Sequence, residues 1–298
     1  MPERIGFLGL GIMGSRMAAR VAQAGFPLTV WTHTPGKAAA WAAEYGESVL
    51  AVDTPAEVAR RSEIVVSMVV DGEQVASVLL GEDGAIEAAR GDLLCVDMST
   101  ISPRDSRRIA AALAERGVRM LDAPVTGSSP RAEAGTLTIM ASGAAEDFAR
   151  AEPLLQAMGE VIVHVGELIG QGEMLKLINN SLGAANAAAL AEALLLAKAT
   201  GVDLDAFVEV TSAGSGASAQ LALKSTPMRE HDYRTLFKTE HMLKDVRLCL
   251  EEAQAAGVPF PSAAHARDLL TATLGRGHGE DDYAAIIEAA EGLAGRRL

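Results

Sequence analysis

Three glycines near the start of the sequence have a spacing that suits phosphate binding. Gly9, Gly11 and Gly14 stand in "GFLGLGIMG", after an apolar run typical of a strand and before a run typical of a helix. In this context the first glycine permits a tight turn, the second lets the backbone approach a pyrophosphate, and the third lets the helix pack closely on the strand. The N–H groups at the helix start then face the anion. The pattern predicts a dinucleotide site over Gly9, Leu10, Gly11, Ile12, Met13 and Gly14, with a glycine-rich turn without ligand as the alternative.

The turn after the second predicted strand, in "VWTHTPGK", bears on which dinucleotide binds. An acidic residue here normally binds the ribose hydroxyls of NAD, and none is present. Hydrogen-bond donors and a cation, which suit a 2′-phosphate, are offered instead by Thr32, His33, Thr34 and Lys37. We therefore predict NADP as the preferred cofactor and NAD as the second candidate, against the alternative of an ordinary polar turn.

A lysine in the second half of the chain stands in an apolar, alanine-rich predicted helix, where a charged residue needs a reason. Lys176 and Asn180 stand four residues apart in "GQGEMLKLINN", within a predicted helix, and share one face with Gly172. An ammonium group held beside a reacting oxygen can stabilise negative charge there and supply a proton. A lysine that extends from the apolar helix to solvent is the alternative.

The elements that must position these residues alternate between strand and helix over residues 4–165. Strands are predicted over "RIGFLG", "LTVWT", "EIVVSMV", "LLCVDM", "VRMLDAP", "TLTIMAS" and "VIVHV". Between the early strands lie predicted helical segments such as residues 12–24, 36–45 and 103–116, the last capped by Ser102. Strand and helix in alternation imply crossover connections and a mainly parallel sheet. We predict a Rossmann-type, doubly wound α/β domain over residues 1–165, the cofactor-binding domain.

From residue 166 the pattern becomes helical. A long helix is predicted over residues 170–200, ending at Gly201, and further helices over 204–212, 241–256, 262–274 and 282–293. We therefore predict an all-helical C-terminal domain over residues 166–298, which carries Lys176 and is joined to the first domain through the long helix.

The composition argues against several function classes. With 39 acidic and 26 basic residues, the formal net charge of -13 disfavours nucleic acid or an anionic membrane as a partner. The two cysteines, Cys95 and Cys249, lie in apolar runs, as expected of reduced thiols in a cytoplasmic protein. The histidines show no metal-ligand spacing, so no metal is expected. No secretory signal is evident, and the apolar stretch over residues 184–197 contains Glu192 and is shorter than the roughly 20 residues of a membrane span.

Six motifs, in order along the chain, carry a family resemblance. They are "GFLGLGIMG", "VWTHTPGK", "VDMSTISP", "DAPVTGSSPRAEAGTL", "GQGEMLKLINN" and "FKTEHMLKDVRLCL". Together they resemble the β-hydroxyacid dehydrogenases, the family of 3-hydroxyisobutyrate dehydrogenase, and most the glyoxylate/succinic semialdehyde reductase and 4-hydroxybutyrate dehydrogenase branch. The sequence departs at two points. Ser128 stands where the 3-hydroxyisobutyrate branch usually has Gly, and His33 stands where the semialdehyde reductases have Arg.

The resemblance implies roles for individual residues. Lys176 matches the family's catalytic lysine and Asn180 its partner. The substrate carboxylate would be held by Thr126, Gly127 and Ser128, with Arg131 as a charge-assisted contact or an ordinary solvated arginine. Phe237 and Asp245 would line the active site, with His241 as a weaker candidate. Thr100 and Lys244 would contact the cofactor, and Met68 and Val69, at the end of a predicted strand, are further cofactor candidates.

The expected function is an NADP-preferring oxidoreductase acting on a small carboxylate-bearing aldehyde or hydroxy acid. The alternatives are an NAD-dependent 3-hydroxyisobutyrate or serine-type dehydrogenase, an imine reductase, and a non-catalytic cofactor-binding sensor. Imine reductases usually lack a lysine at the position of Lys176, which counts against that alternative. A homodimer or homotetramer is expected from the resemblance and the long apolar helix.

Overall fold

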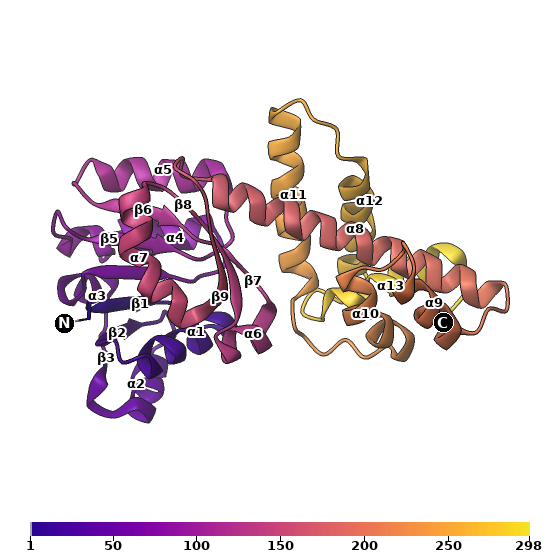
Figure 1. The fold of residues 1–298 in the computed structure, drawn as a ribbon, viewed down its shortest axis with the longest axis horizontal. Helices are drawn as coiled ribbons and strands as arrows, with labels where there is room; N and C mark the ends of the chain where they lie inside the picture. The colour runs from indigo at the N-terminus through magenta and orange to yellow at the C-terminus, as the bar shows by residue number, and fades with distance from the viewer. Residues whose placement is uncertain (1) are drawn as a thin grey trace. The chain divides into compact units, whose positions relative to one another are not determined.

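The computed structural model describes residues 2–298. The chain forms two compact units, which meet in sequence between Lys176 and Leu177. The first is an α/β unit and the second is helical, as the sequence predicts (Figure 1).

The first unit is built on a single sheet of nine strands. Their bounds are β1 (Ile5–Leu8), β2 (Leu28–Trp31), β3 (Val49–Ala51), β4 (Ile64–Ser67), β5 (Leu94–Asp97), β6 (Arg119–Asp122), β7 (Val125–Thr126), β8 (Leu137–Ser142) and β9 (Gly159–Gly166). The order is β3-β2-β1-β4-β5-β6-β8-β7, with β9 paired to β8. All pairs are parallel except β6–β8 and β7–β8, which confirms the predicted mainly parallel sheet. The short strands β3 and β7 were missed because three or two residues are too few to show an alternating pattern.

Helices cover both faces of this sheet (Figure 1). Their bounds are α1 (Ile12–Gln23), α2 (Lys37–Ala42), α3 (Pro55–Arg61), α4 (Gly72–Leu80), α5 (Pro103–Ala114), α6 (Ser128–Ala134) and α7 (Ala145–Met158), with short 3-10 turns η1 (Ala43–Ser48) and η2 (Ala85–Ala88). Successive strand residues point to opposite faces. Phe7 therefore belongs to the same hydrophobic core as Met17 of α1, while Leu8 belongs to the core on the other face, with Val75 of α4. The predicted cap of α5 is present, since the Ser102 hydroxyl accepts the Asp105 N–H at 2.9 Å.

The chain reverses its direction of travel across the sheet between β1 and β4. From β1 it proceeds to β2 and β3 on one side, and then returns to begin β4 on the other side of β1. Open α/β sheets bind their ligands at the carboxyl ends of the strands at such a point, because the connections there diverge and leave a crevice. The glycine-rich turn between β1 and α1 lies at this edge.

The second unit consists of helices around an alanine-rich core. It contains α8 (Gln171–Ala199) from Leu177 onward, α9 (Leu204–Ala213), α10 (Ala219–Glu230), α11 (Thr239–Ala255), α12 (Pro261–Gly275), the turn η3 (Tyr283–Ala285) and α13 (Ile286–Ala294). The sequence missed α10, which contains Pro227 and has no marked apolar stripe. Pro and weak periodicity both argue against a helix when only local sequence is considered.

Helix α8 alone among the described helices is long and apolar enough to cross a membrane. Its best window has a mean hydropathy of 1.3, and 44% of that window is buried inside the protein. Its bounds confirm the long helix predicted over residues 170–200, of which the apolar stretch over residues 184–197 is a part. A single such helix is weak evidence for a membrane span, since the core helix of a soluble protein has the same length and composition.

Candidate active site

Of the three glycines in the loop between β1 and α1, Gly11 is the one with open space at its Cβ position. A side chain on Gly9, whose φ is +104°, would collide with the carbonyl oxygen of Met68, and one on Gly14 would collide with the carbonyl oxygen of Gly9. These two glycines are required by the packing of the loop itself. At Gly11 an added Cβ would meet no protein atom within 4 Å. The small residue there is therefore not needed for packing within the described chain, and the open space suits a pyrophosphate that approaches the backbone.

The start of α1 is prepared for an anion. No side chain caps the helix at Gly11, and its first turn contains no acidic residue. Backbone N–H groups at a helix start carry partial positive charge and are left without intrahelical partners. Together with the open space at Gly11, this makes the loop fit the phosphates of a dinucleotide.

The turn after β2 lies beside the glycine loop. Leu8 of β1 is paired in register with Trp31 of β2, so the residues that follow both strands emerge side by side. The Thr32 hydroxyl accepts the N–H of Leu10 at 3.3 Å, which ties the turn to the loop. The remaining candidates in this segment, His33, Thr34 and Lys37, are exposed.

A buried carboxylate that the sequence analysis did not single out holds the loop after β4. Asp97, at the end of β5, accepts the hydroxyls of Ser67 and Ser99, each at 2.7 Å, and the Ser99 hydroxyl oxygen in turn accepts the N–H of Val69 at 3.0 Å. This fixes the backbone of Met68 and Val69 beside the glycine loop. Burial raises the pKa of Asp97 to about 6, although its hydrogen bonds with the two serines oppose the shift.

The loop from β7 into α6 has an unusual backbone at its centre. Gly127 has a φ of +136° and Ser128 a φ of +58°, a left-handed conformation that residues other than glycine rarely adopt. An added Cβ on Gly127 would lie 2.8 Å from the Cβ of Arg131, so the arginine stem packs over the glycine. Thr126 and Ser128 are half-buried and Arg131 is exposed. The loop thus holds small donor residues in a tight turn with a cation beside it.

Lys176 lies on the buried side of α8, and the alternative that it extends to solvent is wrong. Its exposed fraction is 6%, close to that of Asn180 one turn later on the same helix. Burying a charged amine is costly unless it interacts with other groups. The observed burial therefore favours a functional lysine over a solvated one.

In the second unit, Asn180 binds a buried carboxylate on α11. Its side-chain amide donates to Asp245 at 2.7 Å, and Lys244 Nζ lies 3.3 Å from the other carboxylate oxygen of Asp245. Asp245 is 1% exposed. These three predicted site residues are therefore brought together, although Lys244 and Asp245 lie about 65 residues from Asn180 along the chain.

The segment before α11 positions two further candidates. The rings of Phe237 and His241 lie 6.1 Å apart, and burial lowers the pKa of His241. Asp282 accepts the N–H of Phe237 at 3.0 Å and forms a buried ion pair with Lys224 at 2.6 Å. Sequence reasoning missed Lys224 and Asp282, because the contact joins residues 58 positions apart and neither belongs to a recognisable motif.

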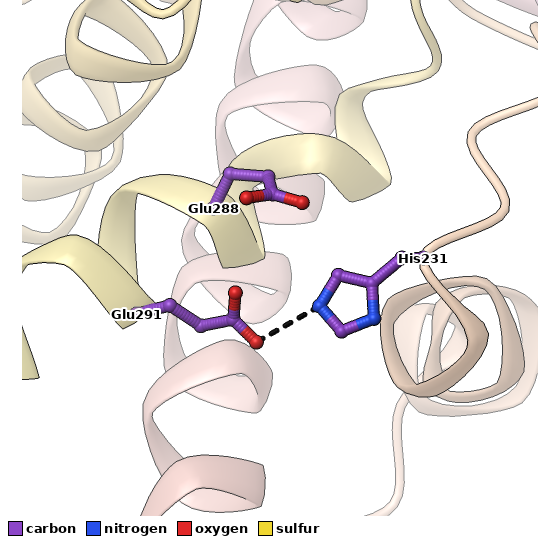
Figure 2. A group of neighbouring side chains, drawn as sticks. All are labelled: His231, Glu288 and Glu291. Atoms are coloured by element: carbon purple, nitrogen blue, oxygen red, sulfur yellow. Dashed lines mark hydrogen bonds and ion pairs between the residues drawn. The ribbon is translucent and has the colours of Figure 1, made fainter. Parts of the chain in front are cut away.

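A second group that the sequence analysis missed lies near the C-terminal end. His231, Glu288 and Glu291 place ligand-type atoms within 4.8 Å of one another, and Figure 2 shows the imidazole pointing at the Glu291 carboxylate. His231 Nε2 lies 2.9 Å from Glu291, which also accepts the N–H of Leu298 at 2.7 Å, and Glu288 accepts the Tyr233 hydroxyl at 2.8 Å. Since protein groups already bind each carboxylate, the cluster holds the C-terminal residues to the start of the segment before α11.

Comparisons with known proteins place this chain in a family. A family model described as the NAD binding domain of 6-phosphogluconate dehydrogenase matches residues 4–166, and one described as the NAD-binding domain of NADP-dependent 3-hydroxyisobutyrate dehydrogenase matches residues 170–290. The chain is 38% identical to the 3-hydroxyisobutyrate dehydrogenase of Pseudomonas aeruginosa over 90% of its own length and 91% of the relative's. The chain belongs to the β-hydroxyacid dehydrogenase family.

Other members of the β-hydroxyacid dehydrogenase family agree with this assignment. The chain is 34% identical to glyoxylate/succinic semialdehyde reductase 2 of Arabidopsis thaliana, over 98% of this chain and 80% of the relative. The solved structure of the 3-hydroxyisobutyrate dehydrogenase of Mycobacterium tuberculosis with L-serine is 30% identical, with a TM-score of 0.87, over 97% of this chain and 99% of that one. The chain is an oxidoreductase of the NAD(P)-dependent class, and its glycine loop lies in the matched cofactor-binding domain.

Proposed function

We propose that this β-hydroxyacid dehydrogenase prefers NADP and transfers a hydride between nicotinamide and a small carboxylate-bearing aldehyde or hydroxy acid, such as succinic semialdehyde or glyoxylate. The observation that carries the proposal is the buried Lys176 on α8, 6% exposed. In this family's fold, a buried lysine can stabilise the negative charge that develops on the substrate oxygen, which accounts for its burial.

Lys176 acts on the substrate oxygen. A nicotinamide cofactor held by the glycine loop would supply or accept the hydride at the substrate carbon. In the reducing direction, the Lys176 ammonium group hydrogen-bonds to the carbonyl oxygen and gives it a proton as negative charge builds up. In the oxidising direction, the neutral amine accepts the alcohol proton. Asn180, held by Asp245 at 2.7 Å, offers its amide oxygen to the lysine or to the substrate.

The substrate acid group is assigned to the loop after β7. Thr126 and Ser128 offer hydroxyl donors, and Arg131, whose stem packs over Gly127, adds positive charge nearby. Hydrogen bonds to an ionised carboxylate are shorter and stronger than those between neutral groups. The relative solved with L-serine contains a ligand with a carboxylate and a hydroxyl, which supports the same substrate class here.

The preference for NADP rests on the turn after β2. Thr32, Thr34 and Lys37 carry donors and a cation, and no acidic residue in residues 30–37 repels a 2′-phosphate. His33, where related semialdehyde reductases have Arg, makes the expected preference smaller than an arginine gives.

An NAD-dependent 3-hydroxyisobutyrate or serine-type dehydrogenase is the second candidate. It is favoured by His33, which offers a weaker grip on a 2′-phosphate than Arg, and by the 38% identity to a 3-hydroxyisobutyrate dehydrogenase. An imine reductase or a non-catalytic sensor is disfavoured by the buried Lys176, which neither function requires.

We also propose that the enzyme is cytoplasmic and assembles as a homodimer or homotetramer. Helix α8 presents an exposed apolar row at helical spacing, with Leu175, Ile178 and Leu182 at 39%, 39% and 50% exposure. A row of this kind on a long helix favours contact with a second copy of the chain.

The test is turnover by the wild-type enzyme and two lysine variants. Lys176→Ala should lower kcat about 10²–10⁴-fold, since a proton donor at the reacting oxygen is lost, while NADPH binding persists. Lys198→Ala, an exposed lysine on the same helix, is the matched control and should keep wild-type kcat. Near wild-type kcat in Lys176→Ala would contradict the assignment.

The substrate class is tested separately. Succinic semialdehyde should be reduced with a higher kcat/KM than butyraldehyde, which has the same carbon chain without the acid group. Equal values for the two aldehydes would show that the loop after β7 does not bind a carboxylate.

A further inference from the structure

The first turn of α8 is held to the sheet by two buried side chains from distant strands. Asp122, at the end of β6, accepts the N–H of Gly170 at 2.8 Å and that of Glu173 at 2.9 Å. Ser142, at the end of β8, accepts the N–H of Gly172 at 3.0 Å and donates its hydroxyl to Asp122 at 2.6 Å. Three backbone donors at the start of the helix are thereby satisfied by groups about 30–50 residues earlier in the chain.

There is no space for the helix start to shift toward the sheet. A side chain on Gly172 would lie 2.9 Å from the Asp122 carboxylate and would collide with the carbonyl oxygen of Met140. The backbone of α8 therefore sits directly against the ends of β6 and β8. A local cap from a neighbouring serine or aspartate would satisfy the same N–H groups without this constraint on position.

A second buried carboxylate ties the same helix turn to the loop after β5. Glu173 is fully buried, and its Oε2 accepts the N–H of Ile101 at 3.2 Å. Ile101 directly follows Thr100, the residue of that loop assigned to the cofactor. Glu173 also precedes Lys176 by three residues, so the two lie on the same side of the helix.

Burying both carboxylates costs free energy of desolvation, and a local cap could start the helix without that cost. Asp122 and Glu173 have no exposed surface, and burial raises the pKa of Asp122 although hydrogen bonds from Ser142, Gly170 and Glu173 oppose the shift. Groups with this cost are retained where they fix a geometry. Here that geometry is the position of the first turn of α8, which carries Lys176, relative to the loop that contains Thr100.

We propose that Asp122 and Glu173 are positioning residues for catalysis. Asp122 fixes the first turn of α8 on the sheet, and Glu173 joins that turn to the cofactor loop after β5, so that Lys176 keeps a set place relative to this loop. The proposal rests on the proposed role of Lys176 in proton transfer.

The test compares variants of Asp122 and Glu173 with a variant of a buried carboxylate elsewhere in the first unit. Glu173→Ala and Asp122→Asn should lower kcat about 10- to 100-fold, because small displacements of reacting groups are costly, while the NADPH dissociation constant stays near that of the wild type. Glu173→Gln keeps an oxygen for the Ile101 N–H and should recover most of kcat. Asp147→Asn is the control: Asp147 is buried on α7 and pairs at 2.7 Å with Arg119, at the opposite end of β6 from Asp122, and its loss should leave kcat unchanged.

Amide hydrogen exchange supplies a readout that does not depend on turnover. In Glu173→Ala, exchange should rise together in residues 98–102 and 170–176, and in Asp147→Asn it should rise in neither. If Asp122→Asn does not fold, Ser142→Ala replaces it. This variant loses the hydroxyl that donates to Asp122 and accepts the N–H of Gly172.

The outcomes separate this inference from the proposed function. If Lys176→Ala abolishes turnover while Glu173→Ala and Asp122→Asn retain it, the positioning role is wrong and the lysine role stands. If kcat and NADPH binding fall together, or Asp147→Asn loses as much kcat, the carboxylates are merely structural. If the wild type does not turn over and only one of the two segments changes exchange, both proposals are wrong.

Discussion

At the scale of single residues, Ser128 holds a backbone conformation that costs free energy. Its φ of +58° lies in the left-handed region, where a residue with a Cβ is less stable than glycine by about 1–2 kcal/mol. A strained residue in a candidate binding loop is expected where its side chain contributes to binding. The hydroxyl of Ser128, beside the acid group of the substrate, is that contribution in the proposed site.

Replacing Ser128 by Gly should therefore improve stability and impair catalysis. We expect Ser128→Gly to raise the free energy of unfolding by up to about 1 kcal/mol, since strain is relieved and part of the gain is offset by the entropy of glycine in the unfolded chain. At the same time kcat/KM for a carboxylate substrate should fall. Urea unfolding and steady-state kinetics measure the two effects. Ser129→Gly, one residue later in α6, is the control and should destabilise the protein without a positive φ to relieve. A loss of stability in Ser128→Gly would contradict the argument.

Cofactor choice also belongs to single residues, in the turn after β2. His33→Arg should increase the ratio of kcat/KM for NADPH over NADH, because the guanidinium stays charged and can bind two phosphate oxygens at once. Thr32→Asp should reverse the preference: a carboxylate at this position can still accept the N–H of Leu10, as the Thr32 hydroxyl does at 3.3 Å, but it repels a 2′-phosphate. A wild type that prefers NADH, with no response to His33→Arg, would show that the turn does not contact the phosphate.

At the scale of elements, the ends of neighbouring strands are joined by buried carboxylates. Asp97 ends β5 and links β4 and its following loop through Ser67 and Ser99, while Asp122 ends β6 and holds the start of α8. The strand ends thereby carry the loops assigned to the cofactor and the helix that carries Lys176. The corresponding element in the second unit is the segment before α11, held by Asp282.

The Asp97 contact makes the stability of the first unit depend on pH. Burial raises the pKa of Asp97 from 3.8 to about 6, so between these values the native state binds this proton more tightly than the unfolded chain does. The contribution of Asp97 to the free energy of unfolding therefore falls as the pH rises from about 4 to 6, by about 3 kcal/mol in total. Asp97→Asn has no carboxyl group to titrate at this position, so its free energy of unfolding should fall less over this pH range than that of the wild type. Urea unfolding of both proteins from pH 4 to pH 7 measures it, and parallel curves for the two proteins would contradict it.

At the scale of the whole molecule, assembly is the property on which the exposed row of α8 bears. Leu175, Ile178 and Leu182 leave apolar surface on a helix that also carries the catalytic candidate. If this row contacts a second copy, Leu182→Glu should shift the protein toward monomer, because a charge in an apolar interface loses its hydration. Light scattering at micromolar concentration measures the mass. The control, Leu293→Glu, changes an apolar side chain that is 78% exposed on α13. A wild-type monomer would rule out the predicted homodimer or homotetramer.

Much of the fold followed from local sequence because its signals are local. The glycine spacing, the alternation of strands and helices and the long α8 are set by backbone sterics and by apolar periodicity over a few residues. The same locality explains the misses: β3 and β7 are too short to show a period, and α10 contains Pro227. The family resemblance supplied the candidate roles of Lys176, Asn180 and Asp245, which single-sequence spacing leaves open.

The sequence by itself determined the candidate site segments: a glycine-rich turn suited to phosphate, a lysine on a helix, and a donor-rich loop. Only the tertiary structure decided which of them are withdrawn from water and what holds them. It buries Lys176, joins Asn180 to Asp245, and places Asp97, Asp122 and Glu173 beside the loops and the helix that carry candidate site residues. The physical reason is range: hydrogen bonds between residues 30 to 72 positions apart depend on how strands pair and helices pack, and no short stretch of sequence records that packing.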